Sequence, residues 1–219
     1  MTEEIKTINI NQEDYPESLK NIAHPPKVLY YKGTIKKAEN CFAIVGARNF
    51  SPYGKQAALK LARDLTNAGL TIVSGLAPGI DTFAHQAVVE MKKRTIAVLG
   101  TGIDEQSIFP KENIKLAQQI VENDGLVISE YGPGIKGSKF TFPQRNRIIA
   151  GLALGVIVVE AKSKSGALIT ANYALSQNKK VFALPGSIYS PNSKGPHQMI
   201  KKGAYLAENS NDILLVLKM

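Results

Sequence analysis

Cysteine, histidine and tryptophan are scarce in this chain of 219 residues, which has one cysteine, three histidines and no tryptophan. The single cysteine, Cys41, cannot form a disulfide within the chain, so a reducing compartment such as the cytoplasm is expected. Without a cysteine cluster or closely spaced histidines, the sequence has none of the common ligand patterns of a zinc site. We therefore expect neither an internal disulfide nor a bound metal.

Long apolar runs are also missing. A membrane-spanning helix needs about 18 consecutive apolar residues, and no such run occurs, so no membrane partner is expected. The N-terminal segment MTEEIKTINI is polar and acidic, unlike a secretory signal. Hydrophobic residues make up 44% of the chain and charged residues 21%, which is typical of a folded globular protein. The length suits one sizeable α/β domain.

Short apolar runs recur from residue 41 onward, and helix-like patterns separate them. The runs are continuously apolar rather than alternating, as in strands buried on both faces of a parallel sheet. They lie at 42–45, 70–74, 95–99, 126–130, 155–160 and 180–184. Between them, Ser51-Pro52 is typical of a helix start, and Gly69 and Gly125 are expected to end two helices. The alternation predicts an α/β fold with a doubly wound, mostly parallel sheet and helices on both faces.

Residues 1–40 differ from the rest of the chain. They contain Pro16, Pro25 and Pro26 and lack the strand–helix alternation, so we expect an extension packed on the core. No internal repeat, low-complexity linker or block of like charge divides residues 41–219. The sequence therefore predicts a single structural domain, with 1–40 as its extension and 41–219 as its core.

Each predicted strand is followed by a loop that contains glycine. Ligands of doubly wound sheets bind beyond the carboxyl ends of the strands, where these loops meet. Glycine lets backbone N–H groups approach an anion closely, and helix N-termini at the same edge add a positive dipole end. Glycine is also common in tight strand–helix turns, but its presence in every loop favours a phosphate-binding site. The loop glycines include Gly46, Gly75, Gly79, Gly100, Gly102, Gly132, Gly134, Gly166 and Gly186.

These glycines do not match the loops that bind common nucleotide cofactors. A dinucleotide fingerprint needs G-x-G-x-x-G after the first strand, but Gly46 is followed by Ala-Arg and no further matching glycine. The GTG segment at 100–102 begins such a pattern, but Glu105 occupies the third glycine position. A Walker A motif is absent from the sequence. We expect no cofactor.

Basic side chains gather between residues 136 and 164. The chain has 27 Lys and Arg against 18 Asp and Glu, a net charge of +9, and this segment alone carries +5. Phe140 and Phe142 interleave with the basic residues, and Arg145-Asn146-Arg147 at a predicted helix start adds forked donors for phosphate oxygens. Basic groups beside aromatic faces are typical of single-stranded nucleic-acid binding.

Candidate catalytic groups are few. Asp81 and His85 lie four residues apart on one predicted helix, but no serine or cysteine completes a nucleophilic set. We interpret Asp81 as a helix cap and His85 as structural. Glu130 and Glu160 end two strands, where they either form an acid/base pair or hold basic side chains and backbone amides in place. We favour the structural role and predict no enzymatic activity.

With these motifs assembled, the chain resembles the DNA-processing protein A family, DprA/Smf. The matching segments are YPESLKNIAHPPKVLYYKG (15–33), AIVGAR (43–48), SGLAPGID (74–81), AVLGTGID (97–104), FPQRNRIIAGL (142–152), VVEAKSKSGALIT (158–170) and VFALPGS (181–187). The resemblance implies an extended Rossmann-like fold, with 41–219 as a DNA-binding domain that holds single-stranded DNA in a basic pocket. It also implies homodimers that protect incoming DNA and load the RecA recombinase during natural transformation.

The resemblance further implies which residues contact the DNA. Arg48 matches the arginine of the family's G-[SA]-R motif, and 145–147 match its FP-x-R-N-R motif. Many members have arginine where Pro78 stands, so one expected contact is missing here. The expected DNA contacts are Gly46, Arg48, Ser74, Gly75, Gly79, Phe140, Arg145, Asn146, Arg147, Lys164, Ser165 and Gly166.

The alternative hypothesis is an enzyme or sensor of a free nucleotide, similar to the lysine-decarboxylase-like phosphoribohydrolases. Those proteins carry a P-G-G-x-G-T loop, which the nearest segment, 164–167, lacks. Glu130 or Glu160 would then be the catalytic carboxylate. Hydrolysis of a nucleoside monophosphate that Glu160→Gln abolishes would support this alternative, and absence of hydrolysis would exclude it.

Overall fold

A mixed nine-stranded sheet forms the centre of the computed structural model, which describes residues 4–219. The strand order is β1-β2-β6-β5-β4-β3-β7-β8-β9. Strands β3 to β9 run parallel to their neighbours, whereas β1 and β2 join the β6 edge in antiparallel fashion. The strands are β1 (Lys6–Asn9), β2 (Val28–Gly33), β3 (Cys41–Val45), β4 (Thr71–Ser74), β5 (Thr95–Leu99), β6 (Leu126–Ser129), β7 (Ala153–Val158), β8 (Lys180–Ala183) and β9 (Tyr205–Leu206).

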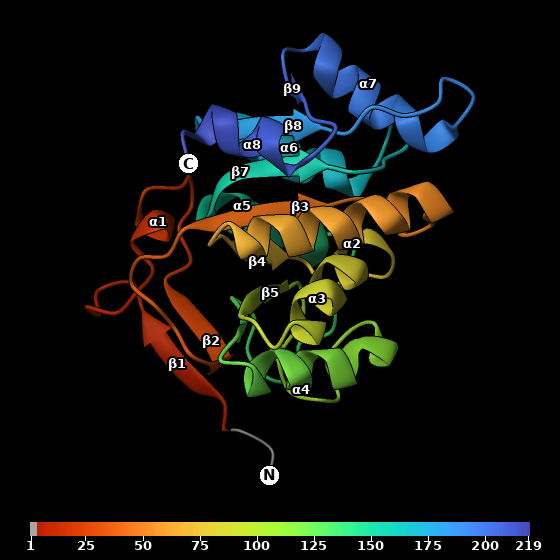
Figure 1. Cartoon of the computed structure of the whole chain (residues 1–219). Helices are drawn as coiled ribbons and strands as arrows, with labels where there is room; N and C mark the ends of the chain where they lie inside the picture. Colours follow the sequence, from red (N-terminus) through yellow and green to blue (C-terminus); the bar gives the residue numbers. More distant parts are fainter. Residues whose placement is uncertain (1–3) are drawn as a thin grey trace.

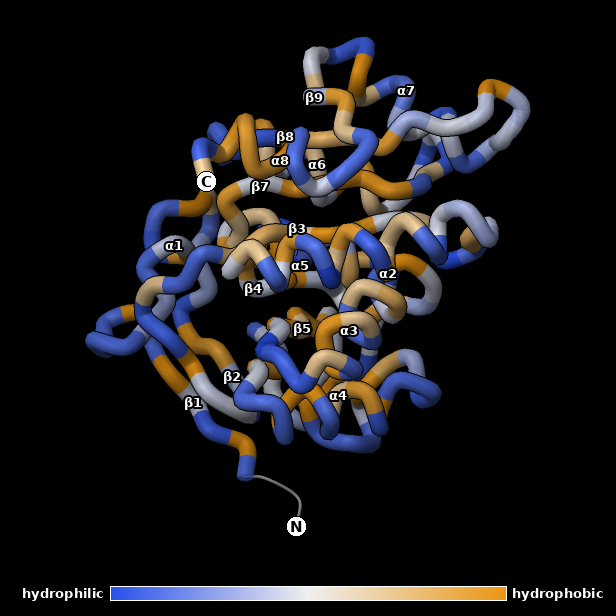
Figure 2. Tube along the Cα trace, in the orientation of Figure 1, coloured by the Kyte–Doolittle hydropathy of each residue, from blue (hydrophilic) through white to orange (hydrophobic). Residues whose placement is uncertain are grey.

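All six strands predicted from apolar runs are present, within two residues of their expected bounds. Every residue of β3 and of β5 is buried, because helices cover both faces of the sheet at these strands. Figure 2 shows the same pattern, with apolar segments along the central strands and hydrophilic segments on the outer turns and loops. The predicted doubly wound, mostly parallel α/β fold of extended Rossmann-like type is confirmed.

The helices divide between the two faces of the sheet. Helices α2, α3, α4 and α8 pack on one face, in front of the sheet in Figure 1, and α1, α5, α6 and α7 pack on the other. The helices are α1 (Glu17–Lys20), α2 (Pro52–Asn67), α3 (Ile80–Glu90), α4 (Ile114–Glu122), α5 (Thr141–Leu152), α6 (Gly166–Ser176), α7 (Lys194–Lys201) and α8 (Ser210–Leu217). Short 3₁₀ turns at Lys111–Asn113 and Pro191–Ser193 precede α4 and α7.

The winding direction reverses between β3 and β7. The chain runs outward from β3 through β4, β5 and β6, then returns along α5 to β7 on the other side of β3. Loops after β3 and β7 therefore diverge to opposite faces and leave a crevice at the carboxyl edge, which is where such sheets bind ligands.

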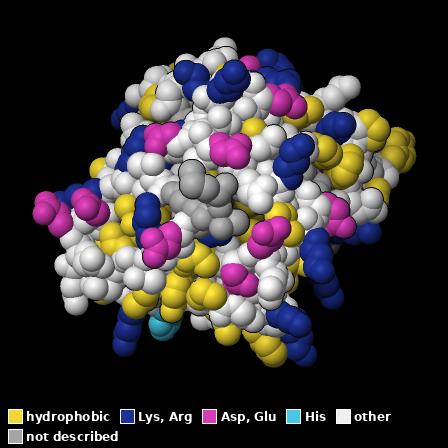
Figure 3. All heavy atoms as spheres, turned by 90° about the horizontal axis from the view of Figure 1, so that it is seen from below, with side chains coloured by type: hydrophobic (Ala, Val, Ile, Leu, Met, Phe, Trp, Pro, Cys, Tyr) yellow, Lys and Arg dark blue, Asp and Glu magenta, His cyan; other side chains and the backbone are white. Residues whose placement is uncertain are grey.

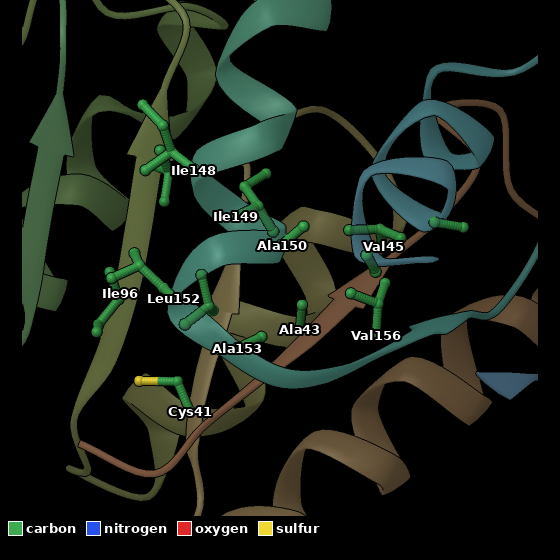
Figure 4. Packing of buried hydrophobic residues seen from close by; sticks show 14 of the residues in the cluster. Cys41, Ala43, Val45, Ile96, Ile148, Ile149, Ala150, Leu152, Ala153 and Val156 are labelled. Atoms are coloured by element: carbon green, nitrogen blue, oxygen red, sulfur yellow. The ribbon is translucent and has the colours of Figure 1, made fainter. Parts of the chain in front are cut away.

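Helix α5 supplies much of the core over this crossover. Ile148, Ile149 and Leu152 pack against β3 and its neighbours, as the close view in Figure 4 shows. Ile148 is fully buried and Ile149 is 1% exposed. Because α5 is held so firmly, the residues at its start are placed accurately at the carboxyl edge.

The predicted helix signals are largely confirmed. Ser51 caps α2 by accepting a hydrogen bond from the Gly54 amide, and Gly69 ends that helix with a φ of +88°. The expectation for Gly125 is wrong in its reason: Asp124, with a φ of 55°, is the left-handed residue after α4. Gly125 is needed for close packing instead, since a Cβ there would lie 2.3 Å from the Ile120 carbonyl oxygen.

The N-terminal segment takes part in the sheet rather than only lying on it. Strand β2 pairs with β6, and β1 pairs with β2. Between them, Tyr15 and Leu19 are fully buried, and the Tyr15 hydroxyl donates to the Pro26 carbonyl oxygen at 2.7 Å. The sequence pattern did not predict strands β1 and β2. The assignment of the whole chain to a single structural domain stays a prediction. Within residues 4–219, no helix is long and apolar enough to cross a membrane.

Stability should depend on pH through His85, which is fully buried on α3. Its Nδ1 lies 2.9 Å from Thr95 Oγ1, and burial lowers the pKa of His85 to about 3. Below about pH 6.5 the unfolded chain binds a proton at this histidine that the folded chain does not. The free energy of unfolding should therefore decrease as the pH falls from about 6.5 towards 3.

This expectation is tested by urea denaturation of the wild type and His85→Gln between about pH 7 and pH 4. The variant should lose less stability across that range than the wild type, whatever its stability at neutral pH. An identical pH dependence for the two proteins would contradict the assignment.

Candidate nucleic-acid interface

A pocket of about 720 Å³ opens at the carboxyl edge of the sheet, over the switch point between β3 and β7. We call it the basic pocket. The loop after β3, the segment before α5 and the loop between β7 and α6 border it. Its lining includes Gly46, Arg48, Asn49, Asp81, Ser138, Lys139, Phe142, Arg145, Asn146, Lys162, Lys164, Ser165, Gly166 and Thr170.

Arg48 is an exposed cation on one side of the basic pocket. Its guanidinium lies over the Phe142 ring, 5.5 Å from the centroid, and this ring is in turn 5.8 Å from that of Phe109. The loop that carries Arg48 rests on the start of α3, where Gly79 has a φ of +85°. A Cβ at Gly79 would lie 2.3 Å from the Ala47 carbonyl oxygen, so only glycine permits this contact.

Beneath the pocket, the buried side chains of Asp81 on α3 and Arg145 on α5 bind the loop after β4 and strand β5. The Asp81 carboxylate accepts a hydrogen bond from the Gly75 amide at 3.1 Å, and the Arg145 guanidinium donates to the Gly75 carbonyl at 2.7 Å and to that of Val98. Burial raises the pKa of Asp81, and the nearby Arg145 charge opposes that rise. Burial lowers the pKa of Arg145 to about 10, with Asp81 acting in the opposite direction. Each charge thus compensates the other.

The opposite side of the pocket is the start of α6. Ser165 caps this helix by accepting from the Ala167 amide at 3.3 Å, and the Asn146 side chain donates to the Gly166 carbonyl at 3.1 Å. Lys164 lies just before the cap and is exposed. The positive end of the helix dipole and a lysine therefore face the same space, which favours an anion there.

The cations around the basic pocket lack acidic partners. Arg48, Lys139, Lys162 and Lys164 are all exposed, and none forms an ion pair with a residue in the described range 4–219. The acidic residue of the lining, Asp81, is offset by Arg145. On the face seen from below in Figure 3, by contrast, basic and acidic side chains intermix. The pocket therefore presents uncompensated positive charge.

Seven of the twelve predicted contacts line this pocket, and the structure changes the roles of several others. Ser74 is fully buried, and its hydroxyl donates to the Ile44 carbonyl oxygen at 2.6 Å. Gly75 and Gly79 are also buried beneath the lining, where they contact Arg145 and the Arg48 loop. The Gly75 amide donates to the Asp81 carboxylate at 3.1 Å, and the contact of this loop with DNA stays a prediction.

Arg147 also lies outside the basic pocket. Its guanidinium forms a two-pronged ion pair with Glu130, at 2.6 and 2.7 Å, and donates to the carbonyl oxygens of His24 and Gln144. Helix geometry explains the difference from Arg145: two residues apart on α5, the two side chains leave the helix about 200° apart and so point in nearly opposite directions. Arg147 joins the N-terminal segment to α5 and β6, so the structure gives it a structural role.

Phe140 stands beside the pocket rather than in its lining. Its side chain is 70% exposed, and the Lys139 ammonium lies 5.2 Å from its ring centroid. An aromatic ring so exposed is available to stack on a base. The lining also contains residues that were not among the predicted contacts, and three of them, Lys139, Lys162 and Phe142, belong to the basic segment identified in the sequence.

The two candidate catalytic carboxylates are both occupied by structural partners. Glu160 is 4% exposed and accepts from the Ser51 amide at 2.9 Å and its hydroxyl at 2.5 Å, which fixes the start of α2. Glu130 is held by Arg147. The nucleotide-hydrolase alternative needs Glu130 or Glu160 as its catalytic carboxylate, and both side chains are engaged by other residues of the protein. Among residues 4–219, no group of three or more His, Cys, Asp or Glu side chains could hold a metal ion.

Fold and pocket together define a Rossmann-like α/β protein with a pocket lined by basic residues at the carboxyl edge of its sheet. Residues 6–218 match the model of the family described as DNA recombination-mediator protein A. The chain belongs to this family, the DprA/Smf family of DNA-processing proteins.

Relatives in sequence and in structure agree with this assignment. The chain is 45% identical to DNA processing protein DprA of Bacillus subtilis, over 95% of its own length and 70% of the relative's. It superimposes with a TM-score of 0.90 on DprA of Streptococcus pneumoniae, at 45% identity, covering 97% of this chain and 74% of that one. DNA processing protein A of Helicobacter pylori, described for its single-stranded DNA binding mode, matches with a TM-score of 0.86 at 32% identity, covering 99% and 96%.

The structural role of Arg147 predicts the effect of removing its partner. Arg147 and Glu130 are 7% and 14% exposed, so Glu130→Gln leaves a buried guanidinium without its counter-charge. We expect a loss of about 3–5 kcal/mol in the free energy of unfolding, measured by urea denaturation. The double variant Glu130→Gln/Arg147→Met should recover part of this loss. A single variant as stable as the wild type would contradict this role.

Proposed function

We propose that this protein binds single-stranded DNA in the basic pocket, protects it and, as a homodimer, loads a RecA recombinase onto it without catalysing a reaction. One observation carries the DNA-binding part: four exposed cations without acidic partners surround a pocket with glycine and a helix N-terminus in its wall. Homodimer formation and RecA loading rest on family membership.

The cations are suited to a phosphate backbone. Arg48 and Lys164 lie on opposite sides of the pocket, so a strand that passes between them brings phosphates to both. The amides at the start of α6 add donors that need no side-chain ordering. Arginine contributes a fork of donors and lysine a flexible point charge, and both act on any sequence.

Aromatic rings at the same site favour unpaired bases over a duplex. Phe140 is exposed beside Lys139, and Phe142 lies under the Arg48 guanidinium. The faces of bases are accessible in a single strand but are stacked inside a duplex, so a duplex cannot use these rings. The Helicobacter pylori relative, which the chain covers over 96% of its length, is described by its single-stranded DNA binding mode, and this supports the proposal.

The salt dependence of binding tests the pocket directly. If four to six phosphates are contacted, log K for oligothymidine should fall with log salt with a slope of about −3 to −4. Arg48→Ala and Lys164→Ala should each reduce the magnitude of the slope by about 0.7 and weaken binding. Fluorescence anisotropy of a labelled oligothymidine across a salt series measures both quantities.

The matched control is Lys115→Ala, which removes one exposed charge on α4, away from the pocket. It should bind like the wild type. Unchanged slopes for both pocket variants would exclude this site. Easy displacement of the strand by a mononucleotide would instead favour a small-nucleotide ligand.

The RecA and dimer parts need a separate measurement. On DNA coated with a single-strand-binding protein, the wild type should increase the rate of RecA filament formation, and Arg48→Ala should not. Sedimentation of the free protein should give twice the mass of the chain. A monomer that still stimulates RecA would contradict the dimer but not the DNA site.

A further inference from the structure

A second hollow, of about 450 Å³, lies between α6 and α7 on the far side of the 164–166 loop. It shares Lys164, Ser165 and Gly166 with the basic pocket, so this loop borders both spaces, and we call it the 164–166 ridge. Both volumes fall in the range of about 300–1,000 Å³ that is usual for small-ligand sites. The second hollow is lined by Ser163, Lys164, Ser165, Gly166, Leu168, Ile169, Asn172, Gln198, Met199 and Lys202.

The 164–166 ridge is exposed at Lys164 and Gly166, and part of it is bare backbone. Gly166 is exposed, and a Cβ built at this residue would meet no atom within 4 Å. Lys164 projects from the same loop and is exposed. A ligand passing from one hollow to the other therefore meets backbone and a single flexible cation rather than a wall of side chains.

The charge of the second hollow continues that of the first. Its lining contains two lysines, Lys164 and Lys202, and no acidic residue. Lys202 is exposed at the end of α7 and forms no ion pair with any residue described in the structure. An anion that leaves the basic pocket over the ridge thus moves toward another uncompensated cation.

Its remaining lining is suited to a nucleobase. Leu168 and Met199 are buried and offer an apolar floor beside Ile169. Asn172 and Gln198 are exposed, and neither side-chain amide has a hydrogen-bond partner in the described part of the chain. Amide groups carry both donors and acceptors, which matches the edges of unpaired bases.

We propose that the second hollow is a further nucleotide-binding subsite: a strand held in the basic pocket continues over the 164–166 ridge. Lys164 neutralises the phosphate that crosses the ridge, Lys202 neutralises the next one, and Asn172 and Gln198 contact the base. This inference rests on the proposed DNA-binding function and assigns the direction in which the strand leaves the pocket. A strand that follows this path contains more nucleotides than the basic pocket alone can hold.

Oligothymidines of two lengths test the path, one of about 4 nucleotides that fills a single pocket and one of about 12 that spans both. Lys202→Ala should weaken binding of the longer strand by about three- to tenfold and reduce the magnitude of its salt slope by about 0.7. Binding of the shorter strand should not change. Gln198→Ala should weaken binding of the longer strand without altering the salt slope, because a neutral amide releases no counterions.

Lys201→Ala is the control, since Lys201 is the exposed neighbour of Lys202 but does not line the hollow. If Lys202→Ala matches this control on the longer strand, or weakens both strands equally, the second subsite is wrong while DNA binding in the basic pocket stands. If the wild type binds neither strand, the proposed function fails, and this inference fails with it.

Discussion

The buried hydrogen bonds by which Asp81 and Arg145 both hold the Gly75 backbone are the constraint on which the rest of the carboxyl edge depends. Two opposite charges lie beneath the pocket, and backbone groups of Gly75 complete their hydrogen bonds. Buried polar groups are costly unless they are hydrogen-bonded, so these bonds hold α3, α5 and the loop after β4 in one arrangement. The loop of Arg48 rests on the same α3 start through Gly79. The shape of the binding surface is therefore set from below, by residues that a ligand need not touch.

The charged side chains near the pocket fall into two groups: those that have partners within the protein and those that remain available to a ligand. Arg145, Arg147 and Glu160 are buried, Glu130 is half-buried, and all four have protein partners, so each stabilises a junction between elements. Arg48, Lys139, Lys162 and Lys164 are exposed and have no acidic partners among residues 4–219. These exposed cations can bind a phosphate at little cost in free energy, because no existing ion pair has to break. That difference explains how a chain with a basic segment can present an open anion site without losing the charges that it needs for folding.

The two hollows on either side of the 164–166 ridge are both lined by exposed cations without acidic partners among residues 4–219. One combines cations with the rings of Phe142 and nearby Phe140, and the other combines cations with two unpartnered amides. A polymer can engage both at once, whereas a mononucleotide can occupy only one. Linking two weak contacts in one strand raises the overall affinity without any new contact. If the proposed path is correct, two adjoining hollows distinguish a strand from a mononucleotide by length rather than by sequence.

The sequence by itself determined the α/β class, the six central strands and the segment that carries the excess charge. Continuous apolar runs and glycine loops are local signals, and they do not need the tertiary structure to be recognised. It did not determine which basic residues are available: Arg145 and Arg147 occupy one motif and look equivalent, yet only the fold turns Arg147 toward Glu130 and Arg145 toward Gly75. Strand β2 was missed for a related reason, since its pairing with β6 joins residues about 100 positions apart, and β1 in turn pairs only with β2. Availability to a ligand is a matter of which partners lie nearby in space, and only the tertiary structure decided that.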